Sequence, residues 1–561
     1  MTKPLLMARL AGTQAEMGAQ HGTLVAGDAA RLFEFYKSMP ERALAGDLQG
    51  PLGAIGRAAV RAIAGVWQAR LVRSRPAELA ARSRAFADAV RAALPAIELP
   101  ADALNAMATM DSLQNCVSLA ARGKLGPFAG TLPRAIVAAA PACSSAMVWG
   151  HATHDGELMF GRNFDFPGVG VWDAAPSFVV CAPTGGQHYG FFATRGADAP
   201  VVTVVNEAGL VLAPHTRWHR DVTFGGAMIV DVIHDIARRA ETLDDAIRIA
   251  RERPISSSWG VAIGSARERS ALVLEIAGPT LEVVRAAPSA SFLICANRYR
   301  TPSLQAGEIA GSEAWAIHSE RRERRLRALV EQREAPLTAD MLARMLGDRH
   351  DVDAPARTRH LGAVLAQATN VHCAVVTPAL RRALVGVDHA PTCEGRWAEL
   401  AWDWAGPTGA WEVGEQNGFT AHVREDLAAP HDAATTAIYE AAQAYDNHHD
   451  VAATFAALER AVAAAPDDPS LRLPAAWLAL EKGLPDRALV HIHAGLATET
   501  EPYRRGQLLL WGARAARTQD PQLARRWNDE LARLGIAELT AASKRSFRGR
   551  PHVNLMMADA Y

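Results

Sequence analysis

The sequence is poor in lysine and has no long hydrophobic run. Five of its 59 basic residues are lysines, and the formal net charge is −1. A protein without excess charge creates no overall field that draws it to nucleic acid or acidic membranes, so we expect neither as a partner. No stretch of 18 apolar residues is present, so no membrane span is predicted. The N-terminal segment lacks the apolar stretch and cleavage site of a secretory signal, and a cytoplasmic location is therefore expected.

Cysteine is also scarce, and its spacing excludes several kinds of site. The six cysteines include no Cys-x-x-Cys pair, so the sequence predicts neither a zinc ribbon nor a thioredoxin motif. At this density a disulfide framework is not expected. His151 and His154 flank a predicted turn without a carboxylate or cysteine at matching spacing. We therefore interpret them as turn residues rather than metal ligands.

The chain is long enough for several domains. Its 561 residues exceed what one hydrophobic core needs. Residues 1–142 carry apolar residues at three- and four-residue spacing and are predicted to be helical. Residues 143–420 begin with strand-like runs separated by turn residues. Residues 430–540 are alanine-rich and helical, so we predict three regions with these bounds.

The middle region alternates groups of strands with groups of helices. Strand-like segments occupy 146–213, and helices are expected at about 226–239 and 242–253. More strands follow, ending at "SFLICAN", and further helices are expected at about 311–334 and 337–347 before two last strands. This grouping predicts an α+β fold with stacked sheets and helical layers, because a dinucleotide-binding fold would alternate single strands with single helices.

The C-terminal region contains an internal repeat. Helices are predicted to begin near Asp450, Asp486 and Asp520, which are 36 and 34 residues apart. Helix pairs at this period resemble tetratricopeptide repeats, which stack on a shared face and often present a groove for a protein or peptide partner. A helical extension that only covers the middle domain, or that forms a dimer, explains the pattern equally well.

Cys143 stands at the head of a predicted hairpin, in "PACSSAMVWGHATHDGELMFGRNFDF". It is either a buried packing residue or a nucleophile, and a nucleophilic thiol needs a base and a positive environment. No histidine has a papain-like or caspase-like context, whereas a free α-amino group, with a pKa of about 8, can serve as the base. Cleavage between Ala142 and Cys143 would supply that group. On this hypothesis Arg162 stabilises the sulfur, Asp165 orients the new ammonium, and the side-chain amide of Asn297 donates to an oxyanion.

Several motifs, taken in order, resemble the acyl-coenzyme A:6-aminopenicillanic acid acyltransferase family of cysteine N-terminal-nucleophile hydrolases. They are "CSS" before a hairpin ending in "GRNFD", then "VVNEAGLVLA", "LICANRYRTP", and "SERRERRLRAL" before "LTADMLARMLGDRHD". The resemblance spans about residues 8–400 and leaves the repeats outside. It implies an αββα sandwich, with a catalytic domain over 143–420 and a propeptide-like region over 1–142. It also explains "DRHDVD" as the segment after a helix rather than a metal site.

The resemblance implies roles for individual residues. Cys143 would be the nucleophile, Arg162 and Asp165 would support it, and Asn297 would contribute to the oxyanion hole. An arginine of the charged helix, Arg321 or Arg322, would reach the same site.

The sequence departs from the more distant bile-salt hydrolases after the N-E-x-G-L turn. There it reads "APHTRWH", without the asparagine of those enzymes. His215, Thr216 or a backbone N–H could donate to the oxyanion instead. Bile-salt hydrolysis is therefore not predicted for this chain.

Together these expectations describe a precursor that cuts itself before Cys143. The mature protein would then transfer an acyl group from a small amide or thioester, acyl-coenzyme A being one candidate donor, to water or an amine. No metal or redox cofactor is needed for this chemistry. Two alternatives stay open: an amidohydrolase without transferase activity, and a tetratricopeptide-type scaffold that binds a partner while its sandwich is catalytically silent.

Overall fold

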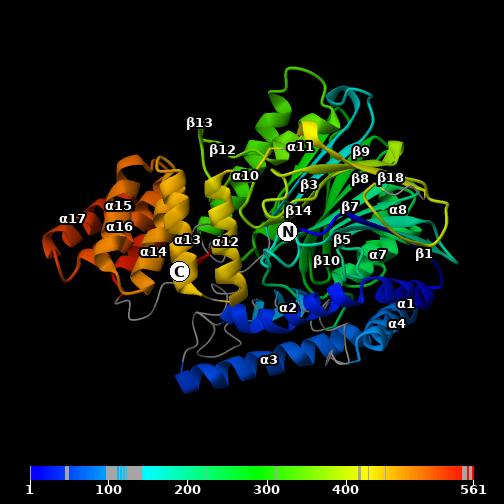
Figure 1. Ribbon diagram of the computed structural model, residues 1–561, viewed down its shortest axis with the longest axis horizontal. Coiled ribbons are helices and arrows are strands. Elements are labelled where there is room, and N and C mark those ends of the chain that lie inside the picture. The colour runs from blue at the N-terminus through cyan, green and yellow to red at the C-terminus, as the bar shows by residue number, and fades with distance from the viewer. Residues whose placement is uncertain are drawn as a thin grey trace.

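The computed structural model describes residues 2–44, 50–95, 142–223, 225–309, 313–414, 418–427, 429–448 and 450–545, with parts of 110–122 and two short pairs near the C-terminus. Two β-sheets lie face to face in the right-hand part of Figure 1, and a bundle of helices from the C-terminal region stands beside them on the left.

The first sheet has nine strands within the described residues, in the order β10-β9-β8-β7-β6-β5-β4-β1-β17. Neighbouring strands are antiparallel except for β1 and β4, which are parallel. The strands are β1 (Leu6–Gly12), β4 (Pro176–Pro183), β5 (Tyr189–Thr194), β6 (Thr203–Asn206), β7 (Leu210–Thr216), β8 (Ser258–Ser265), β9 (Ser270–Ala277), β10 (Thr280–Arg285) and β17 (Gly409–Glu412).

The second sheet has seven strands in the part of the chain that the structure describes, in the order β11-β2-β3-β14-β15-β16-β18, and all its neighbours are antiparallel. The strands are β2 (Ala142–Val148), β3 (Met159–Asp165), β11 (Phe292–Cys295), β14 (Asn370–Thr377), β15 (Arg382–Gly386), β16 (Trp397–Trp402) and β18 (Phe419–Arg424). Two small ribbons add β12 (His350–Asp351) with β13 (Ala354–Thr358), and β19 (Val553–Asn554) with β20 (Asp559–Ala560).

Helices cover the outer face of each sheet. α7 (Ile229–Arg239) and α8 (Leu243–Arg251) pack on the first sheet, and α10 (Glu313–Glu331) and α11 (Ala339–Leu346) pack on the second. The two sheets share an apolar layer between them. Because successive side chains of a strand point to opposite faces, Phe178 and Val180 of β4 face this layer while Val179 and Cys181 face the helices. The predicted α+β fold with an αββα sandwich is confirmed.

The N-terminal region differs from the prediction that it is helical. Four helices follow one another, α1 (Gln14–Leu24), α2 (Ala26–Leu44), α3 (Gly50–Arg73) and α4 (Ala77–Ala93), but β1 precedes them inside the nine-stranded sheet. "LMARLAG" is a short apolar run that ends at a glycine, which is typical of a buried strand. Residues 96–109 and 123–141 lie outside the described residues, so the boundary at 142 stays a prediction.

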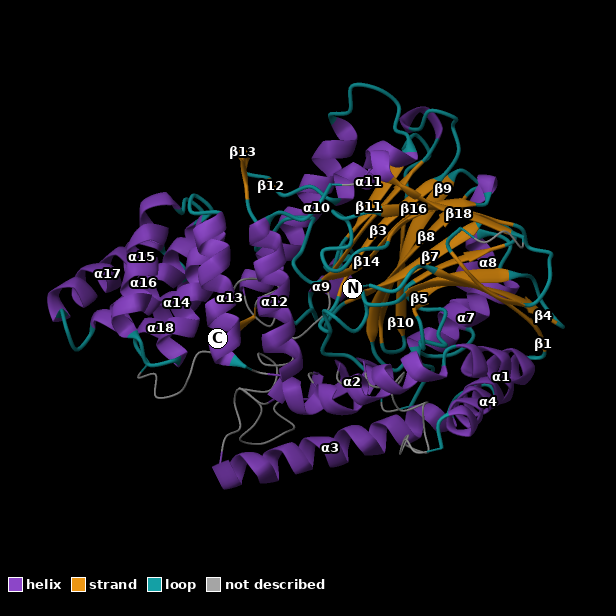
Figure 2. Cartoon of the chain, in the orientation of Figure 1, coloured by secondary structure: helices purple, strands orange, loops and turns teal. Residues whose placement is uncertain are grey.

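The C-terminal region forms pairs of consecutive helices that pack side by side (Figure 2). α13, α15 and α17 begin at Val451, Pro485 and Pro521, next to the predicted starts. The helices are α12 (Ala433–His448), α13 (Val451–Ala464), α14 (Arg472–Glu481), α15 (Pro485–Thr498), α16 (Pro502–Ala516), α17 (Pro521–Leu534) and α18 (Ala537–Ser543), and a short α9 (Pro302–Gln305) lies earlier in the chain. None of the helices that the structure describes is both long and apolar enough to cross a membrane.

Candidate active site

The β2–β3 hairpin places Cys143 inside the sandwich. Cys143 is the second residue of β2 and is only 1% exposed. In the antiparallel register Ser145 lies opposite Arg162, and Ala142 lies opposite Asp165. Because alternate residues share a face, Cys143 and Arg162 both point into the space between the sheets.

Arg162 connects the sulfur of Cys143 to the first sheet. Its Nη2 donates to the Cys143 sulfur at 3.3 Å and to the carbonyl oxygen of Pro214 at 2.6 Å, and its Nη1 donates to Nε2 of His215 at 3.1 Å. Burial and the neighbouring arginines hold the pKa of His215 well below its ordinary value. His215 is therefore a neutral acceptor that orients Arg162, and it also bonds Ser145.

Asn297 and Arg322 hold the backbone of Cys143. The Cys143 N–H donates to Oδ1 of Asn297 at 3.0 Å, and Arg322 Nη1 donates to the Cys143 carbonyl oxygen at 2.7 Å. Arg322 Nη2 donates to the same Asn297 oxygen at 2.8 Å. The Asn297 amide nitrogen donates to the carbonyl of Thr216. Asn297 thus reaches Cys143, but it does so as an acceptor.

Asp165 is a buried carboxylate with one unused oxygen. Its Oδ1 accepts a hydrogen bond from Asn370 at 2.9 Å, and its Oδ2 has no hydrogen-bond partner among the described residues. Burial raises the pKa of Asp165 to about 6, against the opposing influence of Arg322, Asn370 and Arg162. An orphaned buried acceptor is costly, so a group that could donate to it would be bound well.

The thiol of Cys143 is not ionised in advance. Burial raises the pKa of Cys143 above its ordinary value, Arg162 and Arg322 oppose the rise, and Asp165 adds to it. Because the thiolate is the nucleophilic form, the site needs a base that takes the proton during the reaction.

The structure separates the two helical arginines that the sequence could not distinguish. Arg322 reaches Cys143, whereas Arg321 faces the repeats and pairs with Asp353 and Glu501 at 3.2 and 3.3 Å. Successive residues on a helix point about 100° apart, so only one of the two can face the thiol. Arg321 is thus not part of this site.

Other residues at the site were missed by sequence reasoning. Ser144 accepts a hydrogen bond from Arg322, and Nδ1 of His318 accepts one from Arg322 Nε at 3.3 Å. His318 precedes Arg322 by one helical turn, and residues four apart share a face. That spacing was the available signal.

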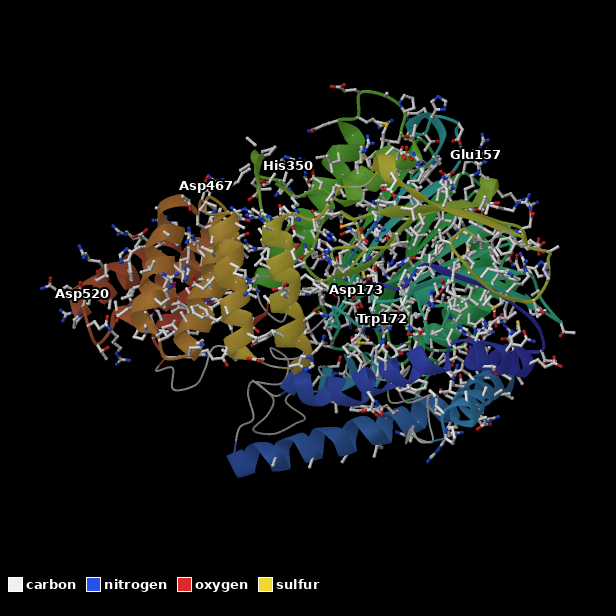
Figure 3. The ribbon with its side chains drawn as sticks, viewed as in Figure 1. Glu157, Trp172, Asp173, His350, Asp467 and Asp520 are labelled. Carbon is white, nitrogen blue, oxygen red and sulfur yellow. The ribbon has the colours of Figure 1, made fainter. Side chains whose placement is uncertain are left out.

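An apolar cavity borders Cys143, and part of its wall comes from the N-terminal region. Seven aromatic side chains line it: Phe33, Tyr36, Phe86, Phe164, Phe166, Trp172 and Trp259. Figure 3 shows Trp172 at the base of the sandwich, beside α2, and its ring meets that of Tyr36 edge to face.

The acidic residues of this cavity wall are already hydrogen-bonded. Asp198 pairs with Arg82 and His21, and Asp111 accepts hydrogen bonds from Trp259 and Ser257. The surface of the cavity is therefore mainly apolar, and a mainly apolar pocket suits an apolar group of a ligand.

The acidic segment "DRHDVD" is held by arginines. Asp348 pairs with Arg325 at 2.7 Å, and Asp351 pairs with Arg359 at 2.8 Å. Asp353 lies near two arginines of α10. Its carboxylates thus serve as ion-pair partners between elements.

Comparison with known proteins identifies the sandwich. Residues 152–389 match the family described as acyl-coenzyme A:6-aminopenicillanic acid acyl-transferase. This segment is similar to that family over less than half of the chain. It contains Arg162, Asp165, Asn297 and Arg322, while Cys143 lies nine residues before its first residue. The resemblance to this family that the sequence motifs predict is confirmed, whereas the self-cleavage and the acyl-enzyme stay predictions.

Two solved structures resemble part of the chain. The N-acylethanolamine-hydrolyzing acid amidase (NAAA) ortholog of Caenorhabditis elegans is 14% identical, with a TM-score of 0.30, over 42% of this chain and 94% of its own. A mutant of the conjugated bile acid hydrolase from Clostridium perfringens is 10% identical, with a TM-score of 0.31, over 52% of this chain and 99% of its own. Among curated protein sequences, none matches this chain.

Proposed function

We propose that the protein is a cysteine hydrolase or acyltransferase that first cuts its own chain between Ala142 and Cys143. The observation that carries the proposal is the environment of Cys143. Its sulfur contacts a guanidinium, Asn297 and Arg322 bond its backbone, and an apolar cavity borders it. The matching family is named after an acyl transfer, which supports the reaction class.

The self-cleavage is an N-to-S acyl shift followed by hydrolysis. The Cys143 sulfur attacks the carbonyl carbon of Ala142, the carbon–nitrogen bond breaks, and the leaving nitrogen takes the proton that the thiol gives up. Water then opens the thioester. The products are a carboxylate on Ala142 and a Cys143 with a free thiol and a free α-amino group.

The new α-amino group supplies the base that the buried thiol lacks. Its pKa of about 8 lets it accept the thiol proton near neutral pH. Asp165 lies opposite Ala142 in the hairpin, and its unpaired Oδ2 can accept a hydrogen bond from the new ammonium. Arg162 then stabilises the thiolate that forms.

The mature Cys143 would attack the carbonyl carbon of an acyl amide or thioester. The amine or thiol of the substrate leaves with a proton, and the acyl group stays on the sulfur until water or an acceptor amine takes it. The aromatic wall next to Cys143 favours an apolar acyl group, because burying its carbon surface contributes roughly 25 cal/mol per Å². Asn297 as an oxyanion donor stays a prediction, since its amide nitrogen would first have to leave Thr216.

The experiment is the intact mass of the purified protein beside Cys143→Ala. We expect the wild type to split into 142 and 419 residues and the variant to stay whole. Cys373→Ala is the matched control, because it removes another buried cysteine of the same sheet and should still split. If Cys143→Ala also splits, or if the wild type stays whole, self-cleavage by Cys143 is wrong.

Product analysis then separates hydrolase from transferase. Incubating the mature protein with a fluorogenic acyl amide, with and without a small acceptor amine, shows whether the acyl group goes to water alone. The scaffold alternative predicts no turnover and no labelling of Cys143 by an acyl-directed electrophile. A protein or peptide partner at the repeats stays a prediction.

A further inference from the structure

The C-terminal repeats contact the candidate active site through a chain of buried polar residues. Figure 1 shows α10 between the sandwich and α12 of the repeats. At one end of α10, Ala314 packs in the same apolar cluster as α14 and α16. About two turns further on, Arg322 of α10 bonds the carbonyl of Cys143.

The first link of the chain is His318. Its Nδ1 accepts from Arg322 Nε at 3.3 Å, and its Nε2 bonds Oε1 of Gln367 at 3.1 Å. Because a guanidinium can only donate, Nδ1 must be unprotonated and Nε2 must carry the proton. Burial and Arg322 keep the pKa of His318 well below its ordinary value, which agrees with this assignment. His318 is only 3% exposed, so water cannot replace either bond.

The second link is the segment 359–367, here named the bridging segment. Its last residue, Gln367, donates from Nε2 to the carbonyl of Gly362 at 2.8 Å and to that of Val364. Gly362 has φ of +104°, and a Cβ there would lie 1.5 Å from Nη2 of Arg504. The segment therefore fits closely against the repeats.

The repeats hold the bridging segment by polar contacts at consecutive residues. Arg359 makes two bonds of 2.7 Å to the carboxylate of Glu499, at the end of α15. The backbone N–H groups of the next two residues donate to Asp468 and to Ser470, and Arg504 donates to the carbonyl of Leu361. Arg359 and Glu499 are each 3% exposed, and a bidentate pair fixes geometry as well as charge.

We propose that the repeats set the position of Arg322 against Cys143, with His318 and Gln367 as positioning residues. On this inference the repeats are a structural part of the catalytic unit. Its catalytic consequence rests on the proposed function, because a displaced Arg322 would no longer hold the Cys143 carbonyl and Asn297. Since a misplacement of 1 Å can cost a factor of about 100 in rate, a smaller displacement should cost about tenfold.

The test breaks the chain of contacts at its far end, in the full-length protein. Glu499→Gln removes the charge by which the repeats hold Arg359, while the pair of Arg359 with Asp351 stays. The matched control is Glu459→Gln. Glu459 pairs with Arg487 inside the repeats, away from the bridging segment. We expect Glu499→Gln to slow self-cleavage and turnover of a fluorogenic acyl amide by about three- to tenfold, with kcat affected more than KM. The control should equal the wild type.

A second readout does not depend on activity. Hydrogen exchange, measured in a Cys143→Ala background so that all chains stay whole, reports on the backbone at the site. Glu499→Gln should speed exchange in peptides covering 142–148 and 313–331 by at least about threefold. A peptide covering 243–251, which is helix α8 on the outer face of the first sheet, should not change. The exchange measurement tests the inference even if the wild type neither splits nor turns over substrate. That outcome would contradict the proposed function but not the inference.

Rescue at His318 separates positioning from general packing. His318→Asn keeps an acceptor near the position of Nδ1, whereas His318→Phe removes it. We expect His318→Phe to lose about tenfold in kcat and His318→Asn to recover most of it. Unchanged exchange at 142–148 in Glu499→Gln, an equal effect of Glu459→Gln, or equal losses in the two His318 variants would each overturn the inference.

Discussion

Replacing Asp165 with asparagine should stabilise the precursor while it impairs the chemistry. The carboxylate is fully buried, one oxygen accepts from Asn370, and the other has no partner among the described residues. Asparagine keeps an acceptor for Asn370 and carries no charge. The Asn variant should nevertheless mature and turn over more slowly, because it cannot orient the α-ammonium of Cys143.

The size of the stabilisation follows from the pKa of Asp165. Burial raises that pKa from 3.8 in the unfolded chain to about 6 in the folded protein, so the folded state binds this proton more tightly. Stability is therefore lost as the pH rises through this interval, and the loss is complete above the folded pKa. At 1.36 kcal/mol per pH unit, the ionised carboxylate costs about 3 kcal/mol at pH 8.

Thermal unfolding across pH 4 to 8 tests this reasoning. Both chains carry Cys143→Ala, so both are precursors, and they differ only by Asp165→Asn. We expect equal Tm values near pH 4 and a Tm several degrees higher for the Asn variant at pH 8. Asp348→Asn is a control of opposite sign, because Arg325 and His350 outweigh burial and lower the pKa of Asp348. A Tm gap that does not change with pH would refute the argument.

Two further predictions concern buried arginines. Arg162→Lys cannot reproduce the guanidinium fork that contacts the Cys143 sulfur, and the lost charged hydrogen bond, worth roughly 1.5–3 kcal/mol, should lower turnover about ten- to hundredfold. Arg9→Lys changes a buried arginine that is remote from the site and should leave turnover unchanged. Equal losses of turnover in the two variants would contradict the prediction. Arg82→Met leaves the buried Asp198 without its main partner and should lower the free energy of unfolding by about 3–5 kcal/mol, which denaturant unfolding measures. Arg487→Met, which breaks an exposed ion pair, is the control. A loss for Arg82→Met no larger than that of the control would contradict the prediction.

The sequence predicted the layers of the sandwich because their signals are local. Hydrophobic residues that repeat every two or every 3.6 positions form patterns within single segments. N-caps such as Asp450 and Asp520 mark the starts of helices within one residue. β1 was missed because it stands alone before a helical region. Its pairing with β4 joins segments about 170 residues apart, and no local pattern encodes such a pairing.

The candidate site likewise contains residues that local patterns predict and residues that only tertiary packing brings together. Cys143, Arg162 and Asp165 lie on one hairpin, and their spacing alone brings them together. The choice between Arg321 and Arg322 depends on how α10 is rotated about its axis, and an error of one residue in that rotation selects the wrong arginine. The aromatic wall draws Tyr36 and its neighbours from the N-terminal region, and that assembly depends on tertiary packing.

The groups around Cys143 fit the cleaved chain better than the intact one. In the precursor the thiol keeps its proton, and Asp165 is buried beside it with an unused oxygen. Cleavage converts the Cys143 amide, one donor, into an ammonium with three, which can satisfy Asn297 and the orphaned oxygen together. The new charge would also offset the cost of ionising Asp165. The same carboxylate that weakens the precursor above pH 6 would thus stabilise the product of its maturation, which gives the self-cleavage a thermodynamic direction.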